Sequence, residues 1–217
     1  GESGTTYSAG PSGEYDGVAV DASGRVLVAE RQVQRGQLRD VNGFCGQYSP
    51  YGTNQVRRFS PEGSTSSTIG GPGSGAGQLA SPTDVAVGAG RVVVADEGSD
   101  RVVAYGDDGT FLWERPLAEP HSVAVSPGGT IYASSNVDGV MQAFSPDGVL
   151  RSAWVAPTFN EQVLAVDGAG RLYALDPVDR VVRAFEPPVD GTDPTVTIDS
   201  PATDAVLVQG ASVLADY

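Results

Sequence analysis

The sequence offers few side chains that could act together as acids, bases or metal ligands, and its histidine content limits the chemistry most. His121 is the single histidine among 217 residues, which excludes a metal centre built from several histidines. Asp84 and His121 each stand beside the start of a short apolar run, and they form the one acid–histidine pair that suggests a binding site. A lone histidine in such a place is more often a structural hydrogen-bonding group than a catalytic base.

Oxygen ligands for calcium are available at Asp16, Asp84 and Asn136. Calcium prefers about six to eight oxygen ligands, and no spacing in the sequence directs these three side chains at one centre. The sequence contains neither an EF-type calcium loop nor a nucleophile elbow. We therefore assign no catalytic or metal-ligating residue, expect no cofactor with calcium left open, and expect a protein that is not an enzyme.

A second group of candidate residues lies in residues 31–53, a stretch punctuated by glycine and proline. Recognition surfaces favour arginine and aromatic side chains, and a loop of about 20 residues is uncommon unless it is functional or mobile. We expect this stretch to contact a protein or a glycan; the alternative is a surface excursion packed on its own side chains. The candidate contact residues are Arg31, Arg35, Arg39, Phe44, Tyr48 and Tyr51.

The chain is strongly acidic, with a formal net charge of -14, and all of its basic residues are arginine. Such a surface repels phosphate backbones and anionic lipid, so we expect no nucleic-acid partner. No apolar run reaches the roughly 20 residues of a membrane helix, so we expect no membrane insertion. Cys45 is the single cysteine, which excludes a disulfide within these residues.

Four copies of one pattern predict the elements that position these residues. Each copy is a short apolar run, a glycine-containing turn and a second apolar run that ends in a small or acidic residue, as in two antiparallel strands. The copies are GVAVDASGRVLVAE (17–30), DVAVGAGRVVVAD (84–96), SVAVSPGGTIYASS (122–135) and VLAVDGAGRLYALD (163–176).

A third strand follows every copy and ends in an aromatic residue, namely Phe59, Tyr105, Phe144 or Phe185. A polar turn comes next and leads into a fourth strand, as in TFLW (110–113) and VLRSAW (149–154). Four strands per roughly 40 residues are typical of a propeller blade. The sequence therefore predicts an all-β protein, a β-propeller of four-stranded blades.

The second copy carries a resemblance to a known repeat. Its PTDVAV (82–87), VVVAD (92–96) and DRVVAY (100–105), preceded by the glycine-rich GPGSGAGQL (71–79), resemble the NHL repeat. The third copy departs from the repeat, with Ser135 at the acidic position and Gly139 where an arginine belongs. We expect an NHL-type propeller over 1–187, with blades at about 15–70, 82–118, 119–158 and 161–187 and an insertion at 31–53.

The resemblance implies where the functional groups lie. In NHL-type propellers the first strand of each blade is innermost, so residues just before it should lie near the mouth of the central channel. The residues concerned are Asp16, Gly17, Thr83, Asp84, His121, Ser122, Gln162 and Val163. Such propellers resemble closed rings of five or six blades, whereas four copies are clear here. Further blades, a partner or a small ring are the alternatives.

Other prominent residues have structural interpretations. Asp96 with Arg101, and Asp176 with Arg180, are expected to brace the turn between the second and third strands. Glu30 occupies the same acidic position in the first copy. Trp113 and Trp154, at the ends of fourth strands, are expected to pack between blades.

After residue 187 the pattern stops. Residues 188–194 have the composition of a linker, and residues 195–217 resemble the opening strands of a bacterial immunoglobulin-like module. About 24 residues cannot bury a sandwich core, so we expect the start of such a module. The alternative is a tail that completes a blade.

Three functional hypotheses follow. The first is a secreted bacterial NHL propeller, extracellular or at the cell surface, that acts as a binding scaffold for a protein or a glycan. The second is a divergent calcium-dependent hydrolase or lyase that uses channel carboxylates. The third is a structural subunit of an extracellular assembly or filament that associates with itself.

Overall fold

The computed structural model describes residues 13–32, 53–137, 139–155, 163–176, 181–185 and 196–197. These residues form four four-stranded antiparallel sheets arranged as a four-blade β-propeller, which confirms the predicted fold class. The short 3-10 turn η1 (Glu97–Ser99) is the only helical element in this described part of the chain. No helix in it is long and apolar enough to cross a membrane.

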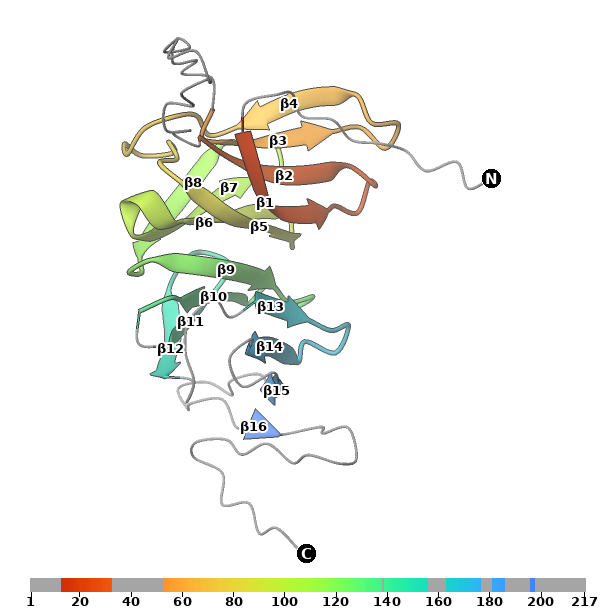
Figure 1. Ribbon diagram of the computed structural model, residues 1–217. Helices are drawn as coiled ribbons and strands as arrows, with labels where there is room; N and C mark the ends of the chain where they lie inside the picture. The colour runs from red at the N-terminus through yellow and green to blue at the C-terminus, as the bar shows by residue number, and fades with distance from the viewer. Residues whose placement is uncertain are drawn as a thin grey trace, which may run out of the picture.

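Strands follow one another across each sheet in sequence order. The first two blades consist of β1 (Gly13–Val20), β2 (Val26–Gln32), β3 (Gln55–Phe59), β4 (Thr65–Ile69), and of β5 (Pro82–Gly88), β6 (Arg91–Asp96), β7 (Arg101–Gly106), β8 (Phe111–Pro116). The next two consist of β9 (Pro120–Val125), β10 (Ile131–Ser135), β11 (Val140–Phe144), β12 (Leu150–Val155), and of β13 (Val163–Val166), β14 (Leu172–Asp176), β15 (Val181–Phe185), β16 (Val196–Thr197). Figure 1 shows the sheets as a fan, with β4, β8, β12 and β16 at its periphery.

The hydrophobic core lies between successive blades. Both faces of a blade are apolar because each strand alternates its side chains between the two neighbouring sheets. The first cluster joins blades one and two, the second joins blades two and three, and the third joins blades three and four. Leu27, Val94, Ile131 and Leu172 are representative members, and all four are fully buried.

The fourth-strand tryptophans pack between blades, as predicted. The ring of Trp113 lies 6.0 Å from that of Phe144, and the ring of Trp154 lies 6.1 Å from that of Phe185. Gly148, with a φ of 79°, lies directly under Trp113, where an added Cβ would come within 2.6 Å of the ring. Glycine is therefore required in this turn for both conformation and packing.

The predicted acid–arginine brace is present in the second blade. Arg101 donates to Asp96 at 3.1 Å, and both side chains are buried. Arg101 also bonds Glu114 and the carbonyls of Ser74, Gly75 and Gln78, so it holds the glycine-rich segment before β5.

The brace differs between blades. Glu30 pairs with Arg57 at 2.8 Å, because Gln55 stands opposite it where Arg101 stands opposite Asp96. In the third blade Ser135 instead accepts a hydrogen bond from the amide of Val137. Arg180, the expected partner in the fourth blade, lies outside the described residues.

The tail contributes to the fourth blade. Val196 and Thr197 pair with Phe185 and Ala184 as the outermost strand. This is the arrangement expected if the tail completes a blade, because the outer edge of β15 needs a strand to satisfy its backbone groups. The linker at 188–194 and residues 198–217 lie outside the described residues, so the immunoglobulin-like module stays a prediction.

Candidate binding site at the channel mouth

The inner strands β1, β5, β9 and β13 bring one position of each repeat together. These four residues are Gly17, Asp84, Ser122 and Val163. An added Cβ on Gly17 would come within 2.6 Å of the Asp84 Cα atom. The small residue of the first blade therefore lets the acidic residue of the second blade approach it closely.

Asp84 and Ser122 connect three blades. One carboxylate oxygen of Asp84 accepts from the Ser122 hydroxyl at 2.7 Å and from the Val123 amide at 2.9 Å. The other oxygen accepts from the Val85 amide at 2.8 Å. The Ser122 oxygen in turn accepts from the amide of Leu164 at 3.1 Å. These bonds fix the second, third and fourth blades to one another at the channel.

Burial raises the pKa of the Asp84 carboxyl above its ordinary value, while its three hydrogen bonds and nearby His121 oppose that rise. Desolvation disfavours a carboxylate, so the proton is held more strongly than in water. Asp84 is thus a half-buried, fully engaged group that supports the site.

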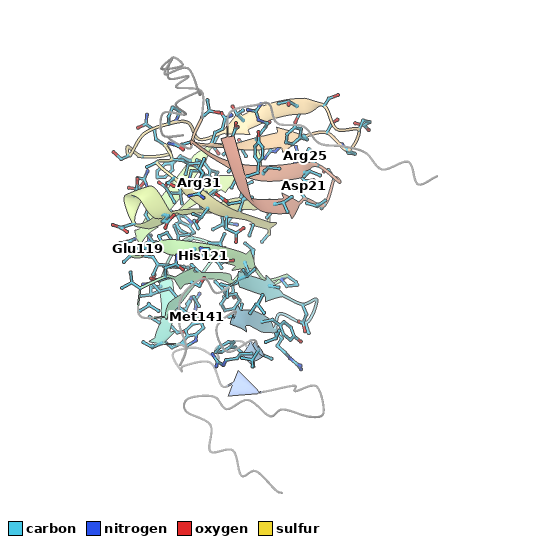
Figure 2. The ribbon with its side chains drawn as sticks, in the orientation of Figure 1. Asp21, Arg25, Arg31, Glu119, His121 and Met141 are labelled. Carbon is cyan, nitrogen blue, oxygen red and sulfur yellow. The ribbon has the colours of Figure 1, made fainter. Side chains whose placement is uncertain are left out.

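A pocket of about 350 Å³ opens above this frame. All four blades contribute to it: its lining residues are Asp16, Arg31, Thr83, Asp84, Glu97, His121, Ser122, Asn136 and Val163. Figure 2 shows Arg31 on the first blade and His121 on the third, with the second blade between them. The structure therefore brings Arg31, Asp84 and His121, three of the predicted site residues, to one place.

An ion pair forms the first-blade wall of the pocket. Arg31, near the end of β2, bonds the carboxylate of Asp16 in β1. Beyond Gln32 the chain enters residues 33–52, which lie outside the described residues. The predicted contacts Arg35, Arg39, Phe44, Tyr48 and Tyr51 belong to that segment and stay predictions.

The segment that carries His121 is held rigidly. The amide of Leu117 donates to the carbonyl of Asp100, and the amide of Glu119 donates to the Asp100 side chain at 2.8 Å. Glu119 has a φ of 41°, a conformation that side chains rarely adopt. The amide of Asn136 bonds the Glu119 carbonyl at 2.9 Å, which helps to retain it.

His121 and Glu97 are the groups most available to a ligand. The imidazole of His121 and the carboxylate of Glu97 receive no hydrogen bond from the residues that the structure describes, and both are half-buried. The repeat pattern predicts the position of His121. Glu97 was missed because it lies in the corner between β6 and β7, where sequence pattern gives no direction for a side chain.

The donor set does not fit a calcium centre. Asp16 is engaged by Arg31, and Asp84 accepts three hydrogen bonds within the protein. Within the described ranges, no group of three or more His, Cys, Asp or Glu side chains is placed to hold a metal ion. The oxygens available in principle are thus committed to the frame of the propeller.

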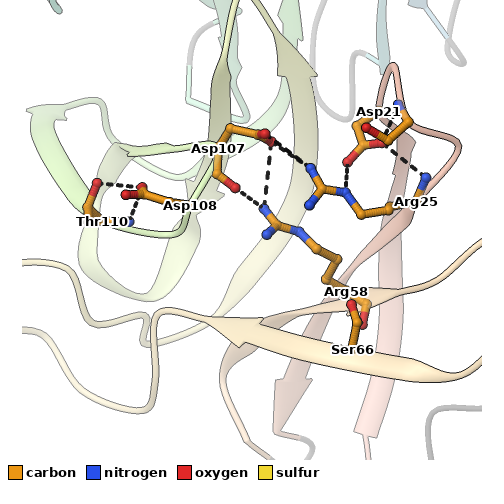
Figure 3. A network of polar contacts seen from close by, with 8 residues as sticks. Asp21, Arg25, Arg58, Ser66, Asp107, Asp108 and Thr110 are labelled. Atoms are coloured by element: carbon orange, nitrogen blue, oxygen red, sulfur yellow. Dashed lines mark hydrogen bonds and ion pairs between the residues drawn. The ribbon is translucent and has the colours of Figure 1, made fainter.

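The opposite end of the blades carries a contrasting polar network, shown in Figure 3. Arg25 pairs with Asp21 at 2.6 Å in the turn between β1 and β2, and reaches Asp107 of the second blade at 3.0 Å. Arg58 donates to the Asp107 carbonyl at 2.8 Å. These contacts join the first two blades and leave the charges paired.

Comparison with known proteins shows the fold of the chain alone. No protein-family model and no curated protein matches the chain, so membership of the NHL family stays a prediction. Solved structures match as propellers. Virginiamycin B lyase from Staphylococcus aureus has a TM-score of 0.59 at 13% identity, over 86% of this chain and 56% of that one.

Two further structures illustrate how different such propellers are. A gluconolactonase from Xanthomonas campestris matches with a TM-score of 0.55 at 20% identity, over 78% of this chain and 56% of that one. A nidogen/laminin complex matches with a TM-score of 0.54 at 18% identity, over 81% and 60%. The chain thus spans little more than half the length of these structures, and at such identities the likeness defines a β-propeller and no particular activity.

Proposed function

We propose that this propeller is a binding module, extracellular or at the cell surface, that recognises a protein or a glycan at its channel mouth. The observation that carries the proposal is the pocket of about 350 Å³, to which all four blades contribute. Its size lies within the range of about 300–1,000 Å³ typical of ligand sites.

The polar groups favour a hydroxyl-rich or cationic group of the ligand. Three carboxylates line the pocket: those of Asp16 and Asp84 are engaged within the protein and add negative charge, while that of Glu97 is open to a ligand. The overall charge of -14 repels anions from this surface. A sugar ring or a basic side chain of a partner protein suits such a lining, since carboxylate and amide groups accept hydrogen bonds from both.

The described residues that flank the insertion lie at the same end of the molecule. Gly13 pairs with Gln32 and Glu30 pairs with Gln55, so the chain leaves and re-enters the first blade at the mouth. Loops at one end of a rigid scaffold commonly carry binding residues. The pocket and the anchors of 33–52 therefore support one recognition face.

The test is a screen of immobilised oligosaccharides and basic peptides, followed by calorimetry on each ligand that binds. We expect His121→Ala and Glu97→Gln each to weaken binding by about tenfold or more, corresponding to about 1.4 kcal/mol. Glu62→Gln, an exposed acid in the turn between β3 and β4 at the far end, is the matched control and should bind as the parent does. Equal losses in all three variants would contradict a site at the mouth.

A second test addresses the insertion. Replacing residues 33–52 by a short glycine-containing turn should preserve the thermal transition, because the pairing of β2 with β3 lies outside that segment. Binding should then be lost or strongly weakened. Unchanged binding would restrict recognition to the pocket and exclude the arginine and aromatic residues of the insertion.

The hydrolase or lyase hypothesis draws support only from structural neighbours, which include a lyase and a gluconolactonase. What this chain shares with those proteins is the β-propeller fold. The engaged carboxylates of Asp16 and Asp84 give calcium no ready site, so the binding module is the function that the geometry supports best.

A further inference from the structure

Equivalent positions of the repeat pack together wherever two successive blades meet. We call the face toward the following blade the front and the face toward the preceding blade the back. Ala95 and Val102 on the front of the second blade pack against Val123 and Ile131 on the back of the third. Met141 and Ala143 on the front of the third blade pack in the same way against the fourth.

The front of the fourth blade carries an exposed aliphatic row. Val163 pairs with Leu175, and Leu175 pairs with Val182, so the three side chains lie side by side across β13, β14 and β15. They are 51%, 43% and 52% exposed. The same row in the second blade is Asp84, Ala95 and Val102, of which Ala95 and Val102 are fully buried.

The back of the first blade is exposed in a matching way. Val18 and Val20 are 68% and 61% exposed. Their counterparts in the second blade, Val85 and Val87, pack against the first blade. Exposed aliphatic side chains in adjacent positions on one sheet mark a contact surface more often than scattered ones do.

From these two faces we propose that a second copy of this chain docks head to tail, with the front of its fourth blade on the back of the first blade. The chain already forms this interface three times between its own blades, and the two exposed faces carry the positions that pack there. The contact is heterologous, so it closes into a ring where the rotation per copy allows and otherwise continues as a chain. This surface meets the recognition face at Val163, which also lines the pocket, whereas Leu175 and Val182 are not among the lining residues of the pocket.

Charge opposes this contact and gives it a recognisable salt dependence. Each copy carries a net charge of -14, so two copies repel each other at low ionic strength. Burial of aliphatic surface is not weakened by added salt. Association through these faces therefore strengthens as ionic strength rises.

The first experiment is sedimentation equilibrium of the 217-residue chain over a range of protein concentrations at low and high ionic strength. The expected result is a mass that rises from 22.3 kDa to multiples of it, with stronger association at high salt. A chain that remains at 22.3 kDa under every condition overturns the proposal.

Variants identify the two faces. Val18→Asp and Leu175→Asp place a charge on the back of blade one and on the front of blade four, and each should abolish homotypic assembly. Val149→Asp, an exposed aliphatic position in the turn before β12, is the control and should assemble as the parent does. Far-UV circular dichroism verifies that all three variants fold.

Mixing the two variants tests the head-to-tail geometry. Val18→Asp chains retain an intact fourth blade, and Leu175→Asp chains retain an intact first blade. An equimolar mixture should therefore form a heterodimer of two chains and no larger species. If Val18→Asp alone assembles as the parent does, or if the mixture stays monomeric, the head-to-tail contact is excluded.

Discussion

The two ends of the propeller treat their charged side chains differently. At the end formed by the turn between β1 and β2, Arg25 binds Asp21 and Asp107, and Arg58 binds the backbone of Asp107. At the channel mouth, a satisfied frame of Asp84 and Ser122 lies beneath His121 and Glu97, which the described residues leave without a hydrogen bond. The same repeat thus forms one end with paired charges and one end where two polar side chains have no hydrogen bond from the described residues.

This contrast separates groups that hold blades together from groups that remain available. The charged side chains at the end formed by the turn between β1 and β2 are partly exposed and paired. Removing one of them should lower the free energy of unfolding only slightly and leave ligand binding unchanged. Replacing a buried polar group at the mouth end should lower the free energy of unfolding substantially. Replacing His121 or Glu97 should weaken ligand binding alone.

The largest effect is expected at Arg101. Removing one partner of a buried ion pair costs about 3–5 kcal/mol, and Arg101→Ala also leaves one carboxylate oxygen of Asp96 and three loop carbonyls without the arginine donor. The matched variant Arg25→Ala at the exposed end should cost about 1 kcal/mol or less. Urea denaturation of both variants measures the difference. Equal losses would contradict the distinction between the two ends.

A smaller loss is expected at Ser122, which links the second, third and fourth blades. Ser122→Ala leaves the amide of Leu164 without its acceptor and removes a donor to Asp84, at a cost of about 1–3 kcal/mol for unsatisfied buried groups. Ser66→Ala, at an exposed position, should stay within about 0.5 kcal/mol of the parent. Chemical denaturation distinguishes the two variants, and a loss at Ser122 no larger than that at Ser66 would exclude the link.

The pH dependence of stability should have opposite signs at the two ends. Burial raises the pKa of Asp84 above its ordinary value of 3.8, so the folded state binds this proton more tightly than the unfolded state. Its ionisation therefore costs stability as pH rises from 3.8 toward the raised pKa.

Asp21 behaves in the opposite sense. Burial pushes its pKa up, but the hydrogen bonds from Arg25 and Ser23 outweigh this effect and hold the pKa below its ordinary value of 3.8. Its contribution is present above pH 3.8 and is lost as pH falls through the lowered pKa. The stability of the parent minus that of Asp84→Asn should fall with rising pH, whereas the difference from Asp21→Asn should rise. Slopes of the same sign would show that one assignment is wrong.

The smallest effect is expected from calcium. Because Asp16 and Asp84 are engaged within the protein, added calcium should leave the melting temperature of a metal-free preparation unchanged. A ligand that binds only the folded state raises stability by about 2.7 kcal/mol at 100 times its Kd. A clear rise in scanning calorimetry, absent in Asp16→Asn, would restore the calcium-dependent hydrolase or lyase hypothesis.

Regular features of the fold could be predicted because they repeat. The alternating valine and alanine runs, the glycine turns and the third-strand aromatics such as Tyr105 each recur in register, and the blades follow directly from them. The same alignment predicts Asp84 and His121 near the channel, since both precede or begin an inner strand.

The polar partners of individual side chains, between blades or across neighbouring strands, could not be predicted. The bond from Ser122 to Asp84 depends on how closely the second and third blades approach, and the contact of Gly17 with Asp84 depends on how closely the first and second blades approach. The pairing of Glu30 with Arg57, rather than with a residue at the corner, depends on Gln55 occupying the arginine position. A pattern within one repeat carries no information on either.

The most direct test of the recognition face uses the single histidine as a reporter. The NMR signals of the His121 imidazole are unique in this sequence, and the indole of Trp113, bonded to the carbonyl of Pro146 between blades, is an internal reference. Oligosaccharides and basic peptides would be titrated singly. A saturable shift of His121 with Trp113 unchanged is the predicted result for a ligand that binds. Saturable binding that leaves His121 unmoved would contradict a recognition site at the channel mouth.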